Sequence, residues 1–301
     1  MKITTLIENR ASNTEPSLAS EWGLSLHIAF NNQSILFDTG ASGSFADNAK
    51  LLSVDLDSVE VLVLSHHHFD HGGGLRRFLE LNSKANVYLA DLPNGECYVG
   101  VLGLLNKYIG LEKEIMNEYA DRFEIVSKPI EVLEDVYALP NILSNHPKPI
   151  GNKQLYLKKN DNFRPDDFTH EIVMAINDNG KLVIFAGCSH NGILNMVDTV
   201  KKEFEGIPIK AMIGGFHLLA SLPFCTEDEI IIKKVKNSKP DDYCFLFSFS
   251  YRRDSRYFAT LPPARTPEAT QGKIPPPIVP APTKKSPSIP TVLLPNLPEP
   301  T

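Results

Sequence analysis

The sequence lacks any apolar run long enough to cross a membrane, and it has no surplus of basic charge. Its longest apolar runs, residues 61–64 and 182–186, are strand-sized, whereas a transmembrane helix needs about 20 apolar residues. The first ten residues contain no apolar signal core. Lys and Arg number 30 against 36 Asp and Glu, a net charge of −6, which argues against nonspecific binding to nucleic acid. We therefore expect a cytoplasmic protein without a membrane or nucleic-acid partner.

Cysteine is also scarce. The 301 residues include four cysteines without CxxC spacing, and so few cannot form a disulfide framework in a chain of this size. A reducing compartment fits this pattern. The four are Cys97, Cys188, Cys225 and Cys244.

Proline is rare in most of the chain and abundant at its end. Of the 23 prolines, 13 fall in the last 40 residues, a composition that does not support a packed core. We predict one domain over residues 1–250 and a proline-rich, disordered tail over residues 251–301. The tail is open to three interpretations: a replaced closing element, the product of a reading-frame shift near residue 245, or a ligand for a partner domain.

Hydrophobic periodicity divides the body into alternating strands and helices. Two apolar runs flank Asn31-Asn32, which indicates a hairpin. Further strands are expected at residues 61–64, 181–186 and 209–213. Helical spacing occurs at residues 45–52, 75–81, 106–123, 193–204 and 226–235. Because both halves contain strands followed by helices, we predict an α/β fold, a four-layer α/β/β/α sandwich.

Four of the nine histidines lie within six residues, in the run SHHHFDHGGG at residues 65–74. The run follows the predicted buried strand at residues 61–64. In an extended segment His66 and His68 point the same way and His67 faces away, so His66 and His68 can share one metal ion. Asp70 and His71 lie where the chain turns into the next helix, within reach of a second ion.

Imidazole and carboxylate donors favour zinc, with one position left for water. The same donors suit Mn²⁺ and Fe²⁺. We therefore predict one or two Zn²⁺ ions, with Mn²⁺ or Fe²⁺ as alternatives.

The run at residues 66–71 resembles the HxHxDH motif of the metallo-β-lactamase superfamily. Within it, the segments LFDTG, SHHHFDHGGGL, GCSHNGI and GGFHL are similar to one subgroup. Its members are called 7,8-dihydropterin-6-methyl-4-(β-D-ribofuranosyl)-aminobenzene 5′-phosphate synthases, or simply metallo-hydrolases. The resemblance covers about residues 1–250 and implies the sandwich fold of the superfamily.

The resemblance also implies which residues bind metal. His190, at a strand-to-helix turn, would complete the first ion with His66 and His68. His217, after the strand at residues 209–213, would serve the second ion beside Asp70 and His71. Asp38, in LFDTG, would support a ligand histidine through a hydrogen bond.

Two further residues are candidate ligands with open roles. The superfamily's bridging aspartate is absent, and Cys188 stands about where it would be. Cys188 is either a ligand or a small buried residue. His170 is either a ligand, a supporting residue or a substrate contact.

The resemblance implies an enzyme that uses metal-activated water to cleave an ester-like or phosphoester bond in a small-molecule substrate, with Asp70 as the catalytic residue that orients the water. Two alternatives remain: a noncatalytic relative that binds a metal or ligand, and a synthase that condenses a pterin with a ribofuranosyl compound.

Overall fold

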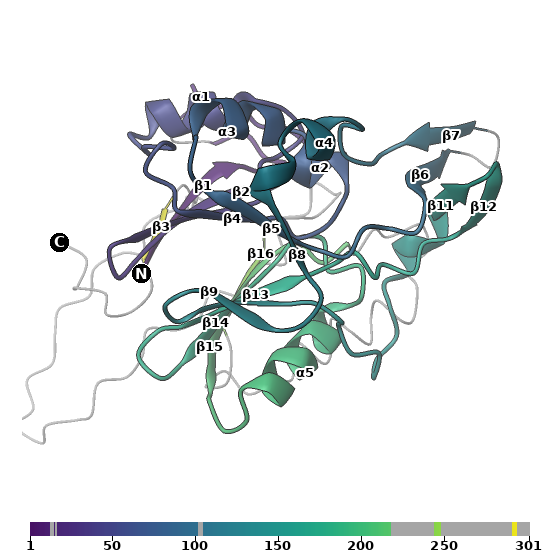
Figure 1. The fold of residues 1–301 in the computed structure, drawn as a ribbon. Coiled ribbons are helices and arrows are strands. Elements are labelled where there is room, and N and C mark those ends of the chain that lie inside the picture. Colours follow the sequence, from purple (N-terminus) through teal and green to yellow (C-terminus); the bar gives the residue numbers. More distant parts are fainter. Residues whose placement is uncertain (13–14, 16, 102–104, 218–243, 248–290, 294–301) are drawn as a thin grey trace, which may run out of the picture.

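A computed structural model describes residues 1–12, 15, 17–101, 105–217, 244–247 and 291–293. Its strands form three sheets, two of which face each other across the molecule (Figure 1). The first has the strand order β17-β1-β2-β3-β4-β5-β8. These strands are β1 (Lys2–Ile7), β2 (Ser25–Phe30), β3 (Gln33–Phe37), β4 (Val61–Val63), β5 (Asn86–Ala90), β8 (Phe123–Val126) and β17 (Thr291–Leu293).

The second sheet has the order β16-β15-β14-β13-β10-β9, and the third, which protrudes to one side, has the order β12-β11-β6-β7 (Figure 1). The second sheet consists of β9 (Ile130–Leu133), β10 (Val136–Leu139), β13 (Val173–Asn177), β14 (Leu182–Ala186), β15 (Ile209–Gly214) and β16 (Cys244–Phe247). The third consists of β6 (Glu96–Val101), β7 (Leu105–Tyr108), β11 (Leu155–Lys159) and β12 (Asn162–Pro165).

Helices cover the outer faces of the two facing sheets (Figure 1). The first sheet carries α1 and α3, and the second carries α5. The helices are α1 (Ser44–Leu51), α2 (Phe69–Gly72), α3 (Leu75–Leu81), α4 (Ile115–Glu118), η1 (Ala120–Arg122), η2 (Ile150–Gln154) and α5 (Ile193–Glu203). The predicted α/β/β/α sandwich is therefore confirmed. No helix among the described segments has the length and apolar character to span a bilayer.

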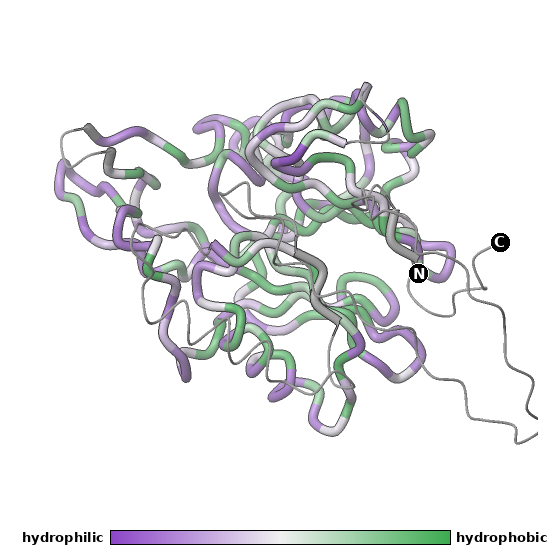
Figure 2. The backbone as a smooth tube through the Cα atoms, turned by 180° about the vertical axis from the view of Figure 1, so that it is seen from behind, coloured by the Kyte–Doolittle hydropathy of each residue, from purple (hydrophilic) through white to green (hydrophobic). Residues whose placement is uncertain are grey.

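Three apolar layers hold the sandwich together. Within β3, Ile35 and Phe37 pack between the two sheets, whereas Leu36 packs beneath α1 and α3. In β14, Phe185 likewise joins the central layer while Ile184 packs against α5. Because these strands are buried on both faces, they read as continuous apolar runs. Figure 2 shows the hydrophobic strands in the interior and hydrophilic segments at the periphery.

Local sequence accounts for several of these elements. Asn31 and Asn32 both adopt positive φ, 48° and 64°, as a two-residue hairpin turn requires. The predicted helices at residues 45–52, 75–81 and 193–204 correspond to α1, α3 and α5.

The helix predicted over residues 106–123 is wrong. The chain there forms β7, a single turn of α4 and the short η1. Its backbone pairs with distant segments instead: Ile109 N–H donates to Cys97 O at 2.9 Å, and Ile109 O accepts from Phe69 N–H at 2.8 Å. Long-range pairing has thus overridden the helical periodicity. The helix predicted at residues 226–235 lies outside the described residues, as does most of the tail.

Candidate metal centre

Loops after three parallel strands carry the predicted ligands. His66 and His68 follow β4, which pairs in parallel with β3. His190 follows β14 and His217 follows β15, which are a parallel pair in the facing sheet. Carboxyl ends of parallel strands meet at one edge of a sheet, and the two sheets present these edges to each other. Segments up to about 150 residues apart in the sequence therefore converge.

The first group of donors is His66, His68 and His190. Their donor atoms all lie within 4.8 Å of one another. The ring centroids of His66 and His68 are 4.6 Å apart, and each lies 4.9 Å from the centroid of His190. All three side chains are buried. Residues predicted to share the first ion thus lie together.

Hydrogen bonds fix the orientation of two of these rings. His66 Nδ1 lies 2.9 Å from Ser65 Oγ, and His190 Nδ1 lies 3.0 Å from Asn152 Oδ1. Their Nε2 atoms are buried, and neither has a hydrogen-bond partner among the described residues. His68 Nε2 is likewise buried without a partner among the described residues. Buried polar atoms are almost always paired, so unpaired imidazole nitrogens clustered in one place are the expected sign of a metal position.

The protonation state of these histidine rings suits the binding of a cation. Burial, followed by the neighbouring histidines, holds the pKa of both His66 and His190 well below the usual value. Burial likewise lowers the pKa of His217 to about 4. These rings are therefore neutral at pH 7 and have lone pairs to donate, as metal ligands require.

The second group consists of Asp70, His71, Cys188 and His217. His71 Nε2 lies 3.1 Å from Cys188 Sγ and 3.8 Å from Asp70 Oδ2. The Cys188, His190 and His217 donors lie within 4.8 Å of one another. His217 Nε2 is buried without a partner among the described residues. Cys188 thus lies close to His71, with which it is grouped together with His66, and close to His217, while Asp70 lies beside His71.

This second group differs from the first in its protonation. Burial opposes a charge on His71, but Cys188 and the carboxylates of Asp38 and Asp70 outweigh it and raise its pKa well above the usual value. Burial raises the pKa of the Cys188 thiol to about 11, against the pull of His71. His71 Nε2 faces Cys188 Sγ at 3.1 Å, so this nitrogen is already engaged, unlike the Nε2 atoms of the first group.

Asp38 is the support of the whole loop. Its Oδ2 lies 2.6 Å from His71 Nδ1, and its Oδ1 accepts from Ser65 N–H at 2.7 Å. Ser65 Oγ donates to the same carboxylate at 2.8 Å. Since Ser65 also contacts His66, one buried carboxylate connects a ring of the first group with a ring of the second. This is the supporting position predicted for Asp38.

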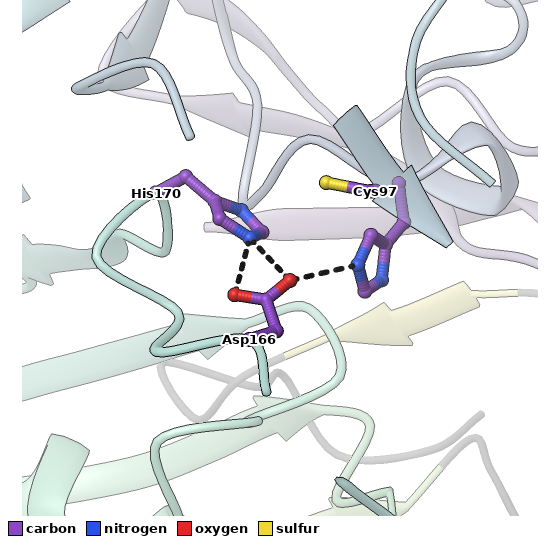
Figure 3. Close-up of side chains that lie close together, drawn as sticks. Cys97, Asp166 and His170 are labelled. Carbon is purple, nitrogen blue, oxygen red and sulfur yellow. Dashed lines mark hydrogen bonds and ion pairs between the residues drawn. The ribbon is translucent and has the colours of Figure 1, made fainter. Parts of the chain in front are cut away.

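His67 and His170 lie beside the two groups. His67 faces away, with Nε2 3.3 Å from Ala90 O, as the strand geometry predicts. His170 Nδ1 accepts from His67 N–H at 3.3 Å, and its Nε2 lies 3.1 Å and 3.2 Å from the Asp166 carboxylate oxygens. Both nitrogens of His170 therefore have partners among the described residues, and Figure 3 shows the Asp166 carboxylate facing its ring.

Sequence reasoning missed three residues that hold His190 in place. Glu171 Oε1 accepts from His190 N–H at 2.7 Å. Phe168 stacks on the ring, with centroids 4.6 Å apart and planes at 6°. Asn152 accepts at the ring and donates to His190 O at 2.7 Å. Phe168 and Glu171 lie in the run at residues 166–171 directly before a strand, and this run was the available signal for them.

The backbone is strained where these loops meet. Asp38, Phe168, Ser189 and His217 have positive φ of 59°, 57°, 56° and 41°, and such residues cluster at functional sites. A Cβ at Gly187 would collide with Ser65 Oγ, so only glycine lets the loop after β14 approach the loop after β4 this closely.

Comparisons with known proteins agree with this geometry. Residues 25–93 match the model of the metallo-beta-lactamase superfamily. The chain is 32% identical over 257 residues to 7,8-dihydropterin-6-methyl-4-(beta-D-ribofuranosyl)-aminobenzene-5′-phosphate synthase of Methanocaldococcus jannaschii, covering 79% of this chain and 83% of that protein. This chain belongs to the metallo-beta-lactamase superfamily.

Two further proteins that are similar to this chain support the assignment. An uncharacterized protein of Methanocaldococcus jannaschii is 30% identical over 72% of the chain and 79% of its own length. A crystal structure described as a metal-dependent hydrolase of the beta-lactamase superfamily is 28% identical, with a TM-score of 0.62. The match covers 78% of this chain and 83% of that one. The resemblance seen in the motifs therefore extends over most of the body.

Proposed function

We propose that this protein is a metal-dependent hydrolase that uses activated water on an ester-like or phosphoester bond of a small molecule. The observation that carries the proposal is the pair of buried, unpartnered Nε2 atoms of His66 and His190. Both rings are neutral at pH 7 and are held by hydrogen bonds at Nδ1. Buried, neutral imidazole nitrogens held in this way are suited to binding a cation.

The donor set fits zinc. His66, His68 and His190 would hold the first ion, and Asp70, His71 and His217 would hold a second, with Cys188 between them. When bound, zinc supplies a Lewis acid and lowers the pKa of a coordinated water towards about 7. Mn²⁺ and Fe²⁺ accept the same nitrogen and oxygen donors.

The chain's own residues then position the reactants. Asp70 is 7% exposed and lies beside His71, so its carboxylate can accept a proton from the attacking water and orient it. Asp38 keeps His71 in one orientation through its contact with Nδ1.

A second candidate function is a condensing synthase. The relative that is 32% identical is named as the synthase of a dihydropterin-ribofuranosyl-aminobenzene phosphate, and the match spans most of both chains. Under this proposal the same donors would bind and orient a pterin and a phosphorylated ribofuranosyl compound. The two functions share the metal centre and differ in what occupies the space beside it.

Metal analysis followed by activity assays tests both candidates. Purified protein is expected to hold zinc, and a panel of chromogenic phosphodiester, lactone and thioester substrates should reveal hydrolysis. Mass spectrometry of a reaction with a ribofuranosylaminobenzene 5′-phosphate and a dihydropterin that carries a leaving group on its 6-methylene carbon would detect the synthase product, with the leaving group released as the carbon–nitrogen bond forms.

The matched pair of variants is His66→Ala and His146→Ala. His146 lies outside both groups, with Nε2 3.0 Å from Asp198. His66→Ala should lose metal and activity while retaining its circular dichroism spectrum, and His146→Ala should keep both. Metal-replete protein that is inert in every assay would instead indicate a noncatalytic binding protein.

A further inference from the structure

The outer edge of β1, in the first sheet, is covered by a segment from the far end of the chain. β1 pairs with β2 on one side and with β17 on the other, antiparallel in both cases. β17 lies near the N-terminus in Figure 1. Among the described segments, β1 would be the outermost strand of this sheet without β17. Three pairs of residues lie directly opposite each other: Lys2 and Leu293, Ile3 and Val292, and Thr4 and Thr291.

The other half of β1 is covered in a different way. A bulge between Thr5 and Ile7 interrupts its register with β2. Within this bulge, Leu6 O accepts from Asn48 Nδ2 of α1 at 2.6 Å, and both residues are buried. Exposed edge strands present N–H and C=O groups that can pair with another chain. A helix side chain therefore occupies the backbone in one half of β1, and β17 pairs with the other half.

The sequence of the tail suits this role at one place. The segment Thr-Val-Leu-Leu at residues 291–294 contains the longest apolar run after Pro262. Pro290 and Pro295 flank it in the sequence. β-branched residues favour strands, whereas proline cannot donate to a ladder and is confined to edge strands and strand ends. The segment is therefore suited to a short strand at the edge of a sheet.

The C-terminal part of the chain supplies an outermost strand to each of the two facing sheets. β17 stands at one end of the first sheet, and β16 stands at one end of the second. The opposite ends are β8 and β9, which follow one another in the chain with only residues 127–129 between them. β16 and β17 therefore complete the same side of the sandwich.

We propose that the outer edge of β1 is a docking site for one extended strand, and that residues 291–293 of the same chain occupy it. Main-chain hydrogen bonds supply the affinity, as they do wherever a peptide adds a strand to a sheet. The docked segment caps the sheet and takes the place that a strand of another chain would need. The tail is then a closing element, the first of the three interpretations of its composition. This inference does not depend on the metal centre.

The variant Val292→Pro/Leu293→Pro, made in the full chain, tests the docking. Its matched control is Ile278→Pro/Val279→Pro, which alters the other adjacent apolar pair of the tail. N–H groups point alternately to the two sides of a strand, so the double substitution removes a donor towards β1 in either register.

Hydrogen exchange measured by mass spectrometry on the peptide that spans residues 2–7 gives the readout. We expect one or two amides of β1 to exchange at least about tenfold faster in Val292→Pro/Leu293→Pro. Amides of the central strand β3 should keep their protection, and the control variant should match the unaltered protein. Unchanged exchange in β1 would overturn the inference.

A cross-link identifies the occupant without relying on the proline variants. Lys2→Cys/Leu293→Cys places cysteines at directly opposite positions, where a Cα separation of about 4.5 to 5.5 Å suits a disulfide. Under mild oxidation we expect a disulfide within one chain, formed at least about tenfold faster than in the control Lys2→Cys/Val279→Cys. A disulfide-linked dimer would show that a second copy supplies the strand. That result, or equal rates in the two variants, would overturn the inference.

Discussion

The two groups of donors at the sheet edges contain similar residues but differ in protonation and in whether their nitrogen atoms already have partners. In the first, His66 and His190 are neutral and their Nε2 atoms are unpartnered. In the second, the pKa of His71 is raised well above its usual value, and His71 Nε2 lies 3.1 Å from Cys188 Sγ. The first group can accept an ion with little change, whereas the second must release a proton first.

This difference implies an order of binding. A preorganised set of neutral donors binds metal tightly, and the second ion must compete with a proton held by Asp38 and Asp70. We therefore expect two classes of metal affinity, with occupancy of the second class depending on pH. The predictions below test this contrast from the largest expected effect to the smallest.

The largest effect is expected from His190→Ala compared with His217→Ala. Removing His190 leaves the first ion with two imidazole ligands. The affinity for the more tightly bound zinc ion should therefore fall by more than about 100-fold, which exceeds the cost of losing a residue that only supports a ligand. His217→Ala should retain one tight equivalent. Isothermal titration with zinc measures both, and similar losses in the two variants would contradict the proposed division.

Asp38→Asn should weaken the second class by about 10- to 100-fold. Asparagine tolerates the positive φ of this position, but it no longer holds His71 Nδ1 as the carboxylate does. We expect this loss of orientation to outweigh the easier release of the His71 proton. The first class should change less, because His66 keeps its contact with Ser65 Oγ. A chelator competition that shows equal losses in both classes would refute the separate role of His71.

Cys188→Ser should have a smaller effect, about tenfold on the second class, and Cys97→Ser is its control. If Cys188 binds the second ion as a thiolate, the cobalt-substituted protein shows a sulfur-to-metal charge-transfer band. That band should disappear in Cys188→Ser and persist in Cys97→Ser. Its absence from the unaltered protein would make Cys188 a packing residue only.

The last prediction concerns the stability of the metal-free protein in acid and not its affinity for metal. The pKa of His217 is lowered to about 4 in the folded state, against about 6.5 when unfolded, so unfolding takes up a proton below pH 6.5. Stability should therefore decline as pH falls from about 6.5 to 4, by up to about 1.4 kcal/mol per pH unit for each such proton. The buried His66 and His190 act in the same direction.

Unfolding midpoints measured with a chelator present, from pH 4 to 8, check this. His217→Gln should make stability depend less steeply on pH, because unfolding of this variant takes up a fraction of a proton less. A midpoint independent of pH between 6.5 and 4 would contradict the neutral, buried state of these rings.

Sequence reasoning predicted the sandwich because its strands and helices have local signatures. The hairpin at Asn31-Asn32 and the helices α1, α3 and α5 depend on nearby residues alone. The ligand loop at residues 66–71 was predictable for the same reason, since strand alternation places His66 and His68 together over three residues.

Long-range contacts account for what sequence reasoning missed. The segment at residues 106–123 has helical spacing, but its backbone bonds to Cys97 and Phe69 instead of to itself. Asn152 and Glu171 both contact His190, which lies 38 and 19 residues away from them in the sequence. Their carboxylate and amide groups are common in loops, so only the fold distinguishes them as supports of a metal centre.

Anomalous X-ray diffraction from zinc-soaked crystals, recorded at the zinc edge, tests the central claim most directly. The account predicts a strong peak about 2.0 to 2.1 Å from Nε2 of His66 and of His190, with a weaker second peak near His71 and His217 that grows with pH. A single peak elsewhere in the molecule, with no density between His66, His68 and His190, would contradict it.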